Sequence, residues 1–305
     1  MRHTYMTLLF LGCCRGWMTT TTRRTVSKTR RYSSTAEPPQ AEVPLYRDQG
    51  LFAVYKPLEW TSSDVVSYIR GILERDARHR GAKPLKVGSR QAKRNKNRVV
   101  KVGHGGTLDP LATGVLVIGV GSGTKELQNY LSGSKAYVAE GELGYETTTL
   151  DSEGNVTQTA GWEQVTPEKL QESLTHFRGS IDQVPPLFSA IRKDGKRMYE
   201  VGREGGTAEL DARPVEVHRL EVTDSNHLPR FSLEVDCGGG TYVRSLIRDI
   251  GYQVDSVATM TALERTKQGP FRLEDCLPRD QWDPDHIYAA IAARTEERVE
   301  ATSSG

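Results

Sequence analysis

Cysteine is scarce in this chain, and the cysteines that occur form no recognisable pattern. The 305 residues contain four, Cys13, Cys14, Cys237 and Cys276, with no CxxC spacing. Structural zinc sites and small disulfide frameworks both need regularly spaced cysteines. The seven histidines supply neither HxxxH nor HExxH. We therefore expect no metal site and a reducing compartment.

Long apolar runs and nucleotide-binding motifs are also lacking. The apolar stretch MTLLFLG at 6–12 is far shorter than the roughly 18 residues that a membrane span requires. The segment GVGSGTK at 119–125 resembles a phosphate-binding loop, but its threonine precedes the lysine, so no GxxxxGK[ST] motif can be drawn. We expect no membrane association and no nucleotide, and no other cofactor motif is visible.

Acidic residues are absent from the first 36 positions, which carry seven lysines and arginines. An acid-free composition rich in arginine, serine and threonine is typical of a mitochondrial transit peptide, and RRYSS at 30–34 resembles a presequence cleavage site. A secretory signal is the alternative, but most of the basic residues follow the apolar stretch rather than precede it. We predict a transit peptide at 1–36, a linker at 37–49 and mitochondrial localisation, with a nuclear or cytoplasmic second location left open.

Positive charge is concentrated in a second segment. Residues 75–101 hold eleven basic residues and one acid, whereas the chain outside this segment and the first 36 residues carries a net charge of −15. The segment 76–101 shows no hydrophobic periodicity, so we expect a basic loop inserted into a folded domain. Such a run either follows a nucleic-acid backbone or is a solvated insertion or nuclear address. The candidate RNA-binding residues in it are Lys93, Arg94, Lys96 and Arg98.

Strand and helix patterns alternate irregularly along the rest of the chain. Strands are expected at 51–57, 115–118 and 135–144, and helices at 124–133, at 166–179 and after Thr61. Residues 231–251 read as a strand, a glycine turn and a helix, and a further helix is expected around 287–293. This order favours an α+β fold over a parallel doubly wound sheet.

The segment GHGGTLDPLATGVLVIG at 103–119 places one carboxylate, Asp109, on a rigid loop. Glycines and Pro110 exclude a helix, and Pro110 favours an extended conformation at Asp109. The apolar run at 115–118 then anchors the loop to the core. Functional residues are often found on loops braced in this way, although most Asp-Pro pairs only close a turn.

Five segments in order resemble the motifs of the TruB-type tRNA pseudouridine synthases. They are GHGGTLDPLATGVLVIG, SKAYVAEGELG, QVPPLFSAIRKDGKRMYEVGREG, CGGGTYVRSLIRDIG and LERTKQGPF, and the form GHGGTLDP resembles the fungal and animal enzymes. The resemblance covers about Gly50 to Pro278. It implies a largely antiparallel sheet core with flanking helices, a catalytic loop in a central cleft, and isomerisation of the T-loop uridine of tRNA, position 55.

The resemblance also assigns roles to individual residues. Asp109 matches the catalytic aspartate, Arg244 the arginine that pairs with it, and Tyr137 the aromatic residue that stacks on the target base. Leu263 matches an apolar position against the base, and His104 a histidine that meets the everted RNA. Lys125 matches a lysine close to the active site. The implied partner is the T-stem-loop of tRNA, with mRNA sites of similar shape as further substrates, and we expect a monomer.

Two departures from the family pattern are visible. Many relatives have Thr-Asp-Thr where this chain has a threonine at Thr148, so a carboxylate at that position is absent. Bacterial relatives continue into a small RNA-binding PUA domain, whereas residues 281–305 provide only a helix and a tail. We therefore predict a catalytic domain at 50–280 and no full PUA domain.

Two other classes of function compete with an isomerase. A non-catalytic RNA-binding or tRNA-folding protein could keep the fold, but loss of the motif's aspartate, tyrosine or arginine would be expected, and all three are present. A glycoside-type hydrolase normally uses two carboxylates around the scissile bond, and we find one embedded in a matching motif.

Overall fold

The computed structural model describes residues 49–85, 97–193 and 195–303, and all statements on structure refer to these residues. The expected transit peptide, Lys93, Arg94 and Lys96 lie outside them. The strands are β1 (Gly50–Lys56), β2 (Val102–His104), β3 (Ala112–Val120), β4 (Lys135–Leu143), β5 (Tyr145–Thr147), β6 (Val156–Thr159), β7 (Gly179–Gln183), β8 (Arg192–Lys193), β9 (Lys196–Arg197), β10 (Arg213–Asp224), β11 (Arg230–Cys237), β12 (Ala258–Gln268), β13 (Phe271–Arg272) and β14 (Cys276–Leu277).

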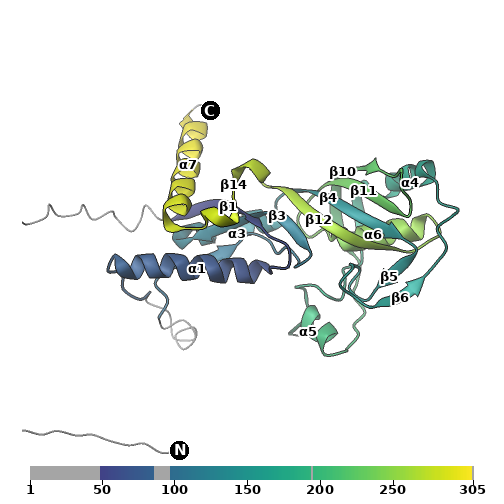
Figure 1. The fold of residues 1–305 in the computed structure, drawn as a ribbon, viewed down its shortest axis with the longest axis horizontal. Coiled ribbons are helices and arrows are strands. Elements are labelled where there is room, and N and C mark those ends of the chain that lie inside the picture. Colours follow the sequence, from purple (N-terminus) through teal and green to yellow (C-terminus); the bar gives the residue numbers. More distant parts are fainter. Residues whose placement is uncertain (1–48, 86–96, 194, 304–305) are drawn as a thin grey trace, which may run out of the picture. The chain divides into compact units, whose positions relative to one another are not determined.

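The strands build one large mixed sheet (Figure 1). In the described part of the chain its order is β14-β1-β3-β12-β4-β11-β10-β7, with β2 paired to β3 and β13 to β12. β1 runs parallel to β14, and β12 runs parallel to β3, whereas the other neighbouring strands are antiparallel. The strands β5 and β6, and β8 and β9, form two smaller sheets. The expectation of an α+β fold with a largely antiparallel sheet is confirmed.

Helices and short 3-10 turns connect the strands or follow them in the sequence. The α-helices are α1 (Ser62–His79), α3 (Leu127–Ser132), α4 (Pro167–Ser173), α5 (Met198–Arg203), α6 (Val243–Gln253) and α7 (Pro284–Ser303). Short 3-10 turns are η2 (Gly121–Lys125), η3 (Leu174–Phe177), η4 (Leu273–Asp275) and η5 (Arg279–Gln281). The helix predicted at 166–179 is thus α4 continued by η3, because the chain tightens into a 3-10 turn after Ser173.

The helix α1 begins where its sequence signals it and ends later than expected. The Thr61 side chain accepts a hydrogen bond from the backbone of Asp64, whose carboxylate accepts one from the backbone N–H of Thr61, so the two residues form a capping box. The expectation that the basic loop starts at residue 76 is wrong, since α1 continues to His79. Ala77 is buried as the next member of the apolar face, and Arg80 pairs with Asp76 at 2.7 Å.

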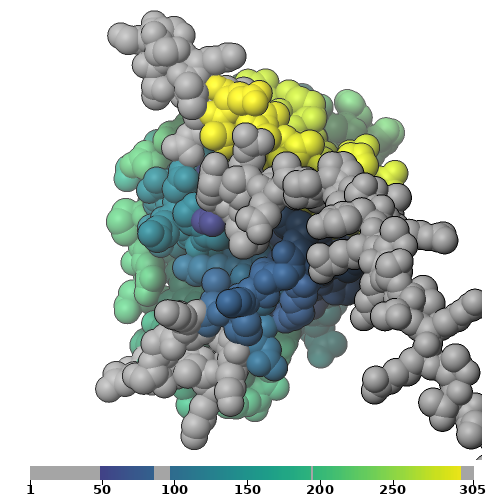
Figure 2. Space-filling model, turned by 90° about the vertical axis from the view of Figure 1, so that its left-hand side faces the viewer, coloured from purple at the N-terminus to yellow at the C-terminus, as the bar shows by residue number. Residues whose placement is uncertain are grey.

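The core lies on both faces of the sheet. The larger cluster packs β4, β11 and β12 against α6 and α4. A second cluster packs β1 and β3 against α1 and the first half of α7, through Ile69 and Leu73 of α1 and Ile287 and Ile291 of α7. Figure 2 shows α7 in yellow and α1 in blue on this side of the molecule.

The strands β3 and β12 approach closely just after the Asp109 loop. Gly114 of β3 has φ +98°, and a Cβ atom there would lie 2.3 Å from the backbone oxygen of Arg265. Glycine is required because any side chain would separate the two strands. This contact places β12 directly beside the loop that carries Asp109.

Candidate active site

The Asp109 loop is fixed by the segment that joins β1 to α1. The buried Ser62 hydroxyl accepts a hydrogen bond from the N–H of Leu108 (2.8 Å) and donates one to its carbonyl oxygen (3.1 Å). The N–H of Glu59 donates to the carbonyl oxygen of Pro110 at 2.9 Å. Asp109 itself is only partly covered, with 34% of its side chain exposed. Its backbone is therefore held while its carboxylate faces accessible space.

Lys56 braces the same loop and was not identified by sequence reasoning. This fully buried lysine donates through Nζ to the carbonyl oxygens of Pro57 (2.8 Å), Trp60 (2.5 Å) and Pro110 (3.3 Å). Burial lowers its pKa to about 8, and the nearby Asp109 carboxylate opposes that shift. Lys56 therefore joins the end of β1 to the Asp109 loop through backbone atoms.

Arg244 pairs with Asp109 from the first turn of α6. Its Nη2 atom lies 2.9 Å from Oδ2 of Asp109, and only 5% of the arginine side chain is exposed. Nη2 also donates to the carbonyl oxygen of Phe188 (2.9 Å), and Nη1 donates to that of Thr149 (2.7 Å). The guanidinium plane is thus fixed by acceptors from three separate segments, which orients its contact with Asp109.

A second carboxylate, Asp151, completes this cluster. Its Oδ2 lies 3.7 Å from Nη1 of Arg244, and its side chain is 5% exposed. Oδ1 accepts hydrogen bonds from the Thr149 hydroxyl (2.5 Å) and the N–H of Glu153 (3.1 Å). Sequence reasoning noted the missing carboxylate at Thr148, which is exposed, but overlooked Asp151 three residues later. The signal available was a carboxylate in a turn-forming stretch directly after a strand.

A cavity of about 190 Å³ opens beside Asp109 and Arg244. Tyr137 of β4 and Leu263 of β12 line it, and Tyr137 is paired across the strands with Arg265. Burial raises the pKa of Tyr137 to about 12, while the neighbouring Arg265 opposes the shift. The cavity therefore joins an ion-paired carboxylate to an aromatic ring and an aliphatic side chain.

Arg265 also lines the cavity of about 190 Å³. It is fully buried and donates to the carbonyl oxygens of Val115 (2.7 Å) and Gly106 (3.2 Å). Burial lowers its pKa, and Tyr137 partly offsets this. Tyr242, which precedes α6, also lines the cavity, and burial raises its pKa. Neither residue was singled out from the sequence, because an arginine in a strand or an aromatic residue before a helix has no distinctive pattern.

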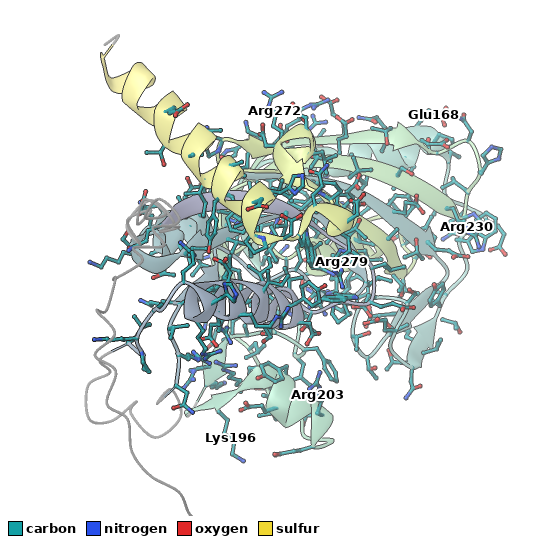
Figure 3. All side chains as sticks on the ribbon, turned by 60° about the vertical axis from the view of Figure 1, so that its left-hand side comes forward. Glu168, Lys196, Arg203, Arg230, Arg272 and Arg279 are labelled. Carbon is teal, nitrogen blue, oxygen red and sulfur yellow. The ribbon has the colours of Figure 1, made fainter. Side chains whose placement is uncertain are left out.

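A wider groove of about 810 Å³ continues from Asp109 to the segment around α5. Its lining includes His104, Asp151 and Glu153 and the basic side chains of Arg192, Arg197 and Arg203. Figure 3 shows Lys196 and Arg203 labelled on the ribbon that carries this basic segment. The His104 ring accepts a weak hydrogen bond from the N–H of Gly106 at 3.4 Å, and burial lowers its pKa. The groove therefore connects Asp109 with three basic side chains.

The structure does not bring Lys125 to the cavity, contrary to the expectation that it lies close to the active site. The nine-residue strand β3 separates the Asp109 loop from η2, which contains Lys125, and such a strand spans about 26 Å. Lys125 instead lines a groove of about 460 Å³ with Lys83 and Lys101. Among described residues this groove has no acidic lining residue. The N–H of Leu85 donates to the carbonyl oxygen of Arg98 at 2.7 Å, beside this groove.

The described residues contain neither a metal-binding cluster nor a membrane-spanning helix. No group of three or more histidine, cysteine, aspartate or glutamate side chains there is arranged to hold a metal ion. Over the same part of the chain, no helix is both long and apolar enough to cross a bilayer.

Known pseudouridine synthases resemble this chain in sequence. Residues 93–243 match the family model described as TruB family pseudouridylate synthase (N terminal domain). The chain is 45% identical over 244 residues to Pseudouridylate synthase TRUB1 of Homo sapiens, covering 79% of this chain and 67% of that protein. It is 41% identical over 222 residues to tRNA pseudouridine synthase B of Phocaeicola vulgatus, covering 73% of this chain and 86% of that protein.

Two solved structures also resemble this chain, at lower sequence identity than the relatives above. A chain in the crystal structure of a Cbf5-Nop10-Gar1 complex matches with a TM-score of 0.55 and 26% identity, over 80% of this chain. A chain of an H/ACA RNP bound to a substrate RNA containing 2′-deoxyuridine matches with a TM-score of 0.52 and 25% identity, over 77% of this chain. This chain spans 60% and 53% of their lengths.

The fold and the relatives define the class as pseudouridine synthases, isomerases that act on uridine in RNA. Within that class, the chain belongs to the TruB family of tRNA pseudouridine synthases.

Proposed function

We propose that this protein isomerises the T-loop uridine of tRNA, position 55, to pseudouridine, with Asp109 as the reactive carboxylate. The observation that carries the proposal is the 2.9 Å pair between Asp109 and the buried Arg244 at the mouth of a cavity lined by Tyr137 and Leu263. The tRNA pseudouridine synthases among its relatives support the choice of substrate.

The reaction needs no net addition or loss of atoms. The bond from ribose C1′ to uracil N1 breaks, the base turns, and a bond forms from C1′ to C5. The hydrogen on C5 leaves as a proton, and N1 gains one. Asp109 begins this sequence either by attack as a nucleophile or by removing the ribose 2′ proton. Arg244 fixes the orientation of the carboxylate in both routes.

The target uridine must leave its stack to reach Asp109, at a cost of a few kcal/mol. Tyr137 offers a ring face for the everted base, and Leu263 offers an apolar surface in the same cavity. A cavity of this composition replaces part of the lost stacking. His104 lines the wider groove, and we propose that it contacts the RNA beside the everted nucleotide.

Basic side chains outside the cavity are proposed to bind the tRNA backbone. Arg192, Arg197 and Arg203 line the wider groove. The acid-free groove with Lys83, Lys101 and Lys125 adds a second basic surface. In the basic insertion of the sequence, we propose Lys93, Arg94, Lys96 and Arg98 as further phosphate contacts. We propose that the protein acts as a monomer in mitochondria, with mRNA stem-loops of T-loop shape as additional substrates.

The test is tritium release from tRNA labelled at uridine C5. Wild-type protein is expected to release tritium from tRNA but not from a transcript with cytidine at position 55, and Asp109→Asn should release none while binding tRNA normally. Asp249→Asn makes the same chemical change on α6 away from the cavity and is the matched control. Turnover by Asp109→Asn at a few per cent of the wild-type rate would contradict the role of Asp109.

The same assay tests the other parts of the proposal. Release from an mRNA stem-loop with the T-loop sequence would support the wider substrate range, and no release would limit the enzyme to tRNA. Light scattering during gel filtration measures the mass of the protein in solution. The mass of a dimer would contradict the proposed monomer.

A further inference from the structure

Three aromatic rings surround the guanidinium group of Arg279 next to the start of α1. The guanidinium carbon lies 4.0 Å from the ring centre of Tyr68, 4.7 Å from that of Trp60 and 5.0 Å from that of Trp282. The rings stand edge-on or tilted to one another, with centroids 5.7 to 6.0 Å apart. We call these four residues the arginine box.

The arginine box has a structural part and an exposed part. Trp282 is buried and donates its Nε1–H to the carbonyl oxygen of Leu277 at 3.0 Å, so it belongs to the packing of the C-terminal segment. Arg279 is exposed, and Tyr68 is 40% exposed. Within the described residues, Arg279 pairs with no carboxylate and none of its side-chain N–H groups donates a hydrogen bond.

This combination determines what the side chain can bind. Three aromatic rings within 5.0 Å of the guanidinium carbon restrict its rotamers and fill much of the space around it, so a nucleic-acid base has little room to stack there. Its N–H edge stays available in a planar fork that matches two oxygens of one phosphate. A phosphate group is therefore a better ligand for Arg279 than a base.

The start of α1 links the arginine box to the wider groove beside Asp109, which we call the catalytic groove. The carbonyl oxygen of Trp60 accepts the 2.5 Å hydrogen bond from Lys56, which also contacts Pro110 beside Asp109. Thr61, the next residue, lines the wide groove that contains Asp109. An RNA strand leaving this groove over the start of α1 would reach Arg279.

We propose that Arg279, held by Trp60, Tyr68 and Trp282, binds a backbone phosphate of the substrate tRNA where the RNA leaves the catalytic groove. The inference rests on the proposed function for the choice of RNA, but it concerns a contact outside the cavity. Figure 3 shows Arg279 labelled near the start of α1, well away from Arg230.

The experiment compares tRNA binding by wild-type protein, Arg279→Gln and a control across a range of salt concentrations. Losing one phosphate contact should lower the slope of log affinity against log salt by about 0.7 to 0.9, which corresponds to about five- to eightfold weaker binding at 0.1 M salt. Tritium release in a single turnover at saturating tRNA should keep the wild-type rate.

The control is Arg230→Gln, which removes the same charge from an exposed side chain at the start of β11. It should leave the slope and the affinity at their wild-type values. An equal loss in both variants would mean that only overall charge matters, and it would overturn the proposed contact.

Melting temperature separates binding from a purely structural role of the arginine box. A lower melting temperature of Arg279→Gln with unchanged salt slope and affinity would show that Arg279 only holds the C-terminal segment, and it would overturn the proposal. If Arg279→Gln does not fold, Arg279→Lys is decisive, because it keeps the charge but loses the planar fork. It should keep the wild-type slope with weaker affinity, and wild-type affinity would overturn the proposal.

The outcomes also separate this inference from the proposed function. If wild-type protein releases no tritium from tRNA yet Arg279→Gln lowers the salt slope, the phosphate contact stands and the proposed reaction fails. If tritium release depends on Asp109 and the slope does not change, the reaction stands and the Arg279 contact fails.

Discussion

Replacing Arg244 by lysine should disable the enzyme although it preserves the charge. The two terminal nitrogens of Arg244 face four acceptors, which are Asp109 at 2.9 Å, Thr149 at 2.7 Å, Phe188 at 2.9 Å and Asp151 at 3.7 Å. Nη2 faces Asp109 and Phe188, and Nη1 faces Thr149 and Asp151. A lysine ammonium is a single point charge and cannot reach both pairs of acceptors at once.

The magnitude follows from the contacts that are lost. If the lysine keeps Asp109 and one carbonyl oxygen, about two charge-assisted contacts disappear, each worth roughly 1.5 to 3 kcal/mol. The total of about 3 to 6 kcal/mol is divided between stability and the orientation of Asp109. If at least half of it affects the transition state, kcat falls by about tenfold to a hundredfold or more.

Single-turnover tritium release at saturating tRNA measures this effect separately from binding. Arg248→Lys is the matched control, because Arg248 lies one turn further along α6, contacts Asp249 and Val184, and does not line the cavity. It should retain the wild-type rate. The reasoning is refuted if Arg244→Lys also reacts within about threefold of the wild-type rate, or if its defect is confined to KM.

Four further predictions concern other parts of the chain. Asp151→Asn removes a charge 3.7 Å from Arg244, an attraction of about 4 kcal/mol at an effective dielectric constant of 20, so kcat should fall at least tenfold with unchanged tRNA affinity, and an unchanged kcat would contradict this. Tyr137→Phe should keep much more activity in tritium release than the alanine variant, since base stacking is worth about 1 to 3 kcal/mol, and equal losses would assign the chemistry to the hydroxyl. The pKa of Lys56 is lowered to about 8 from an ordinary value of 10.5, so the unfolded state binds more protons between these pH values, and the unfolding free energy of the wild type should rise with pH there relative to Lys56→Met in urea denaturation; a constant difference would argue against a lowered pKa. Residues 1–36 fused to a fluorescent reporter should direct it to mitochondria, and a wholly cytosolic or secreted reporter would reject the transit peptide.

Features that depend on local sequence could be predicted. The strand at 51–57 and the helix after Thr61 are present because the short apolar run, the capping pair and the proline stop all act within a few residues. The α+β class followed from the irregular order of elements. The prediction of a loop at 76–79 was wrong, because charged residues on the outer face of α1 obscured the buried Ala77.

The site could be predicted only in part. Asp109 was identifiable because its loop has an unusual local composition, whereas the roles of Arg244, Tyr137 and Leu263 came from the resemblance to a family. The prediction that Lys125 lies close to the active site was wrong. Lys125 is only 16 residues from Asp109 in the sequence, but the extended strand β3 lies between them, and Lys125 follows the end of β3 that is far from Asp109.

The sequence by itself determined the local elements, the rigid loop under Asp109 and, through its motifs, the family. Tertiary structure alone decided which groups complete the site. Asp151 reaches Arg244 across 93 residues of chain, and Lys56 reaches Pro110 across 54. Neither contact can be recognised from periodicity or composition in the sequence, because each depends on how the sheet brings distant loops together. A buried charge is stable only where such loops supply its partners.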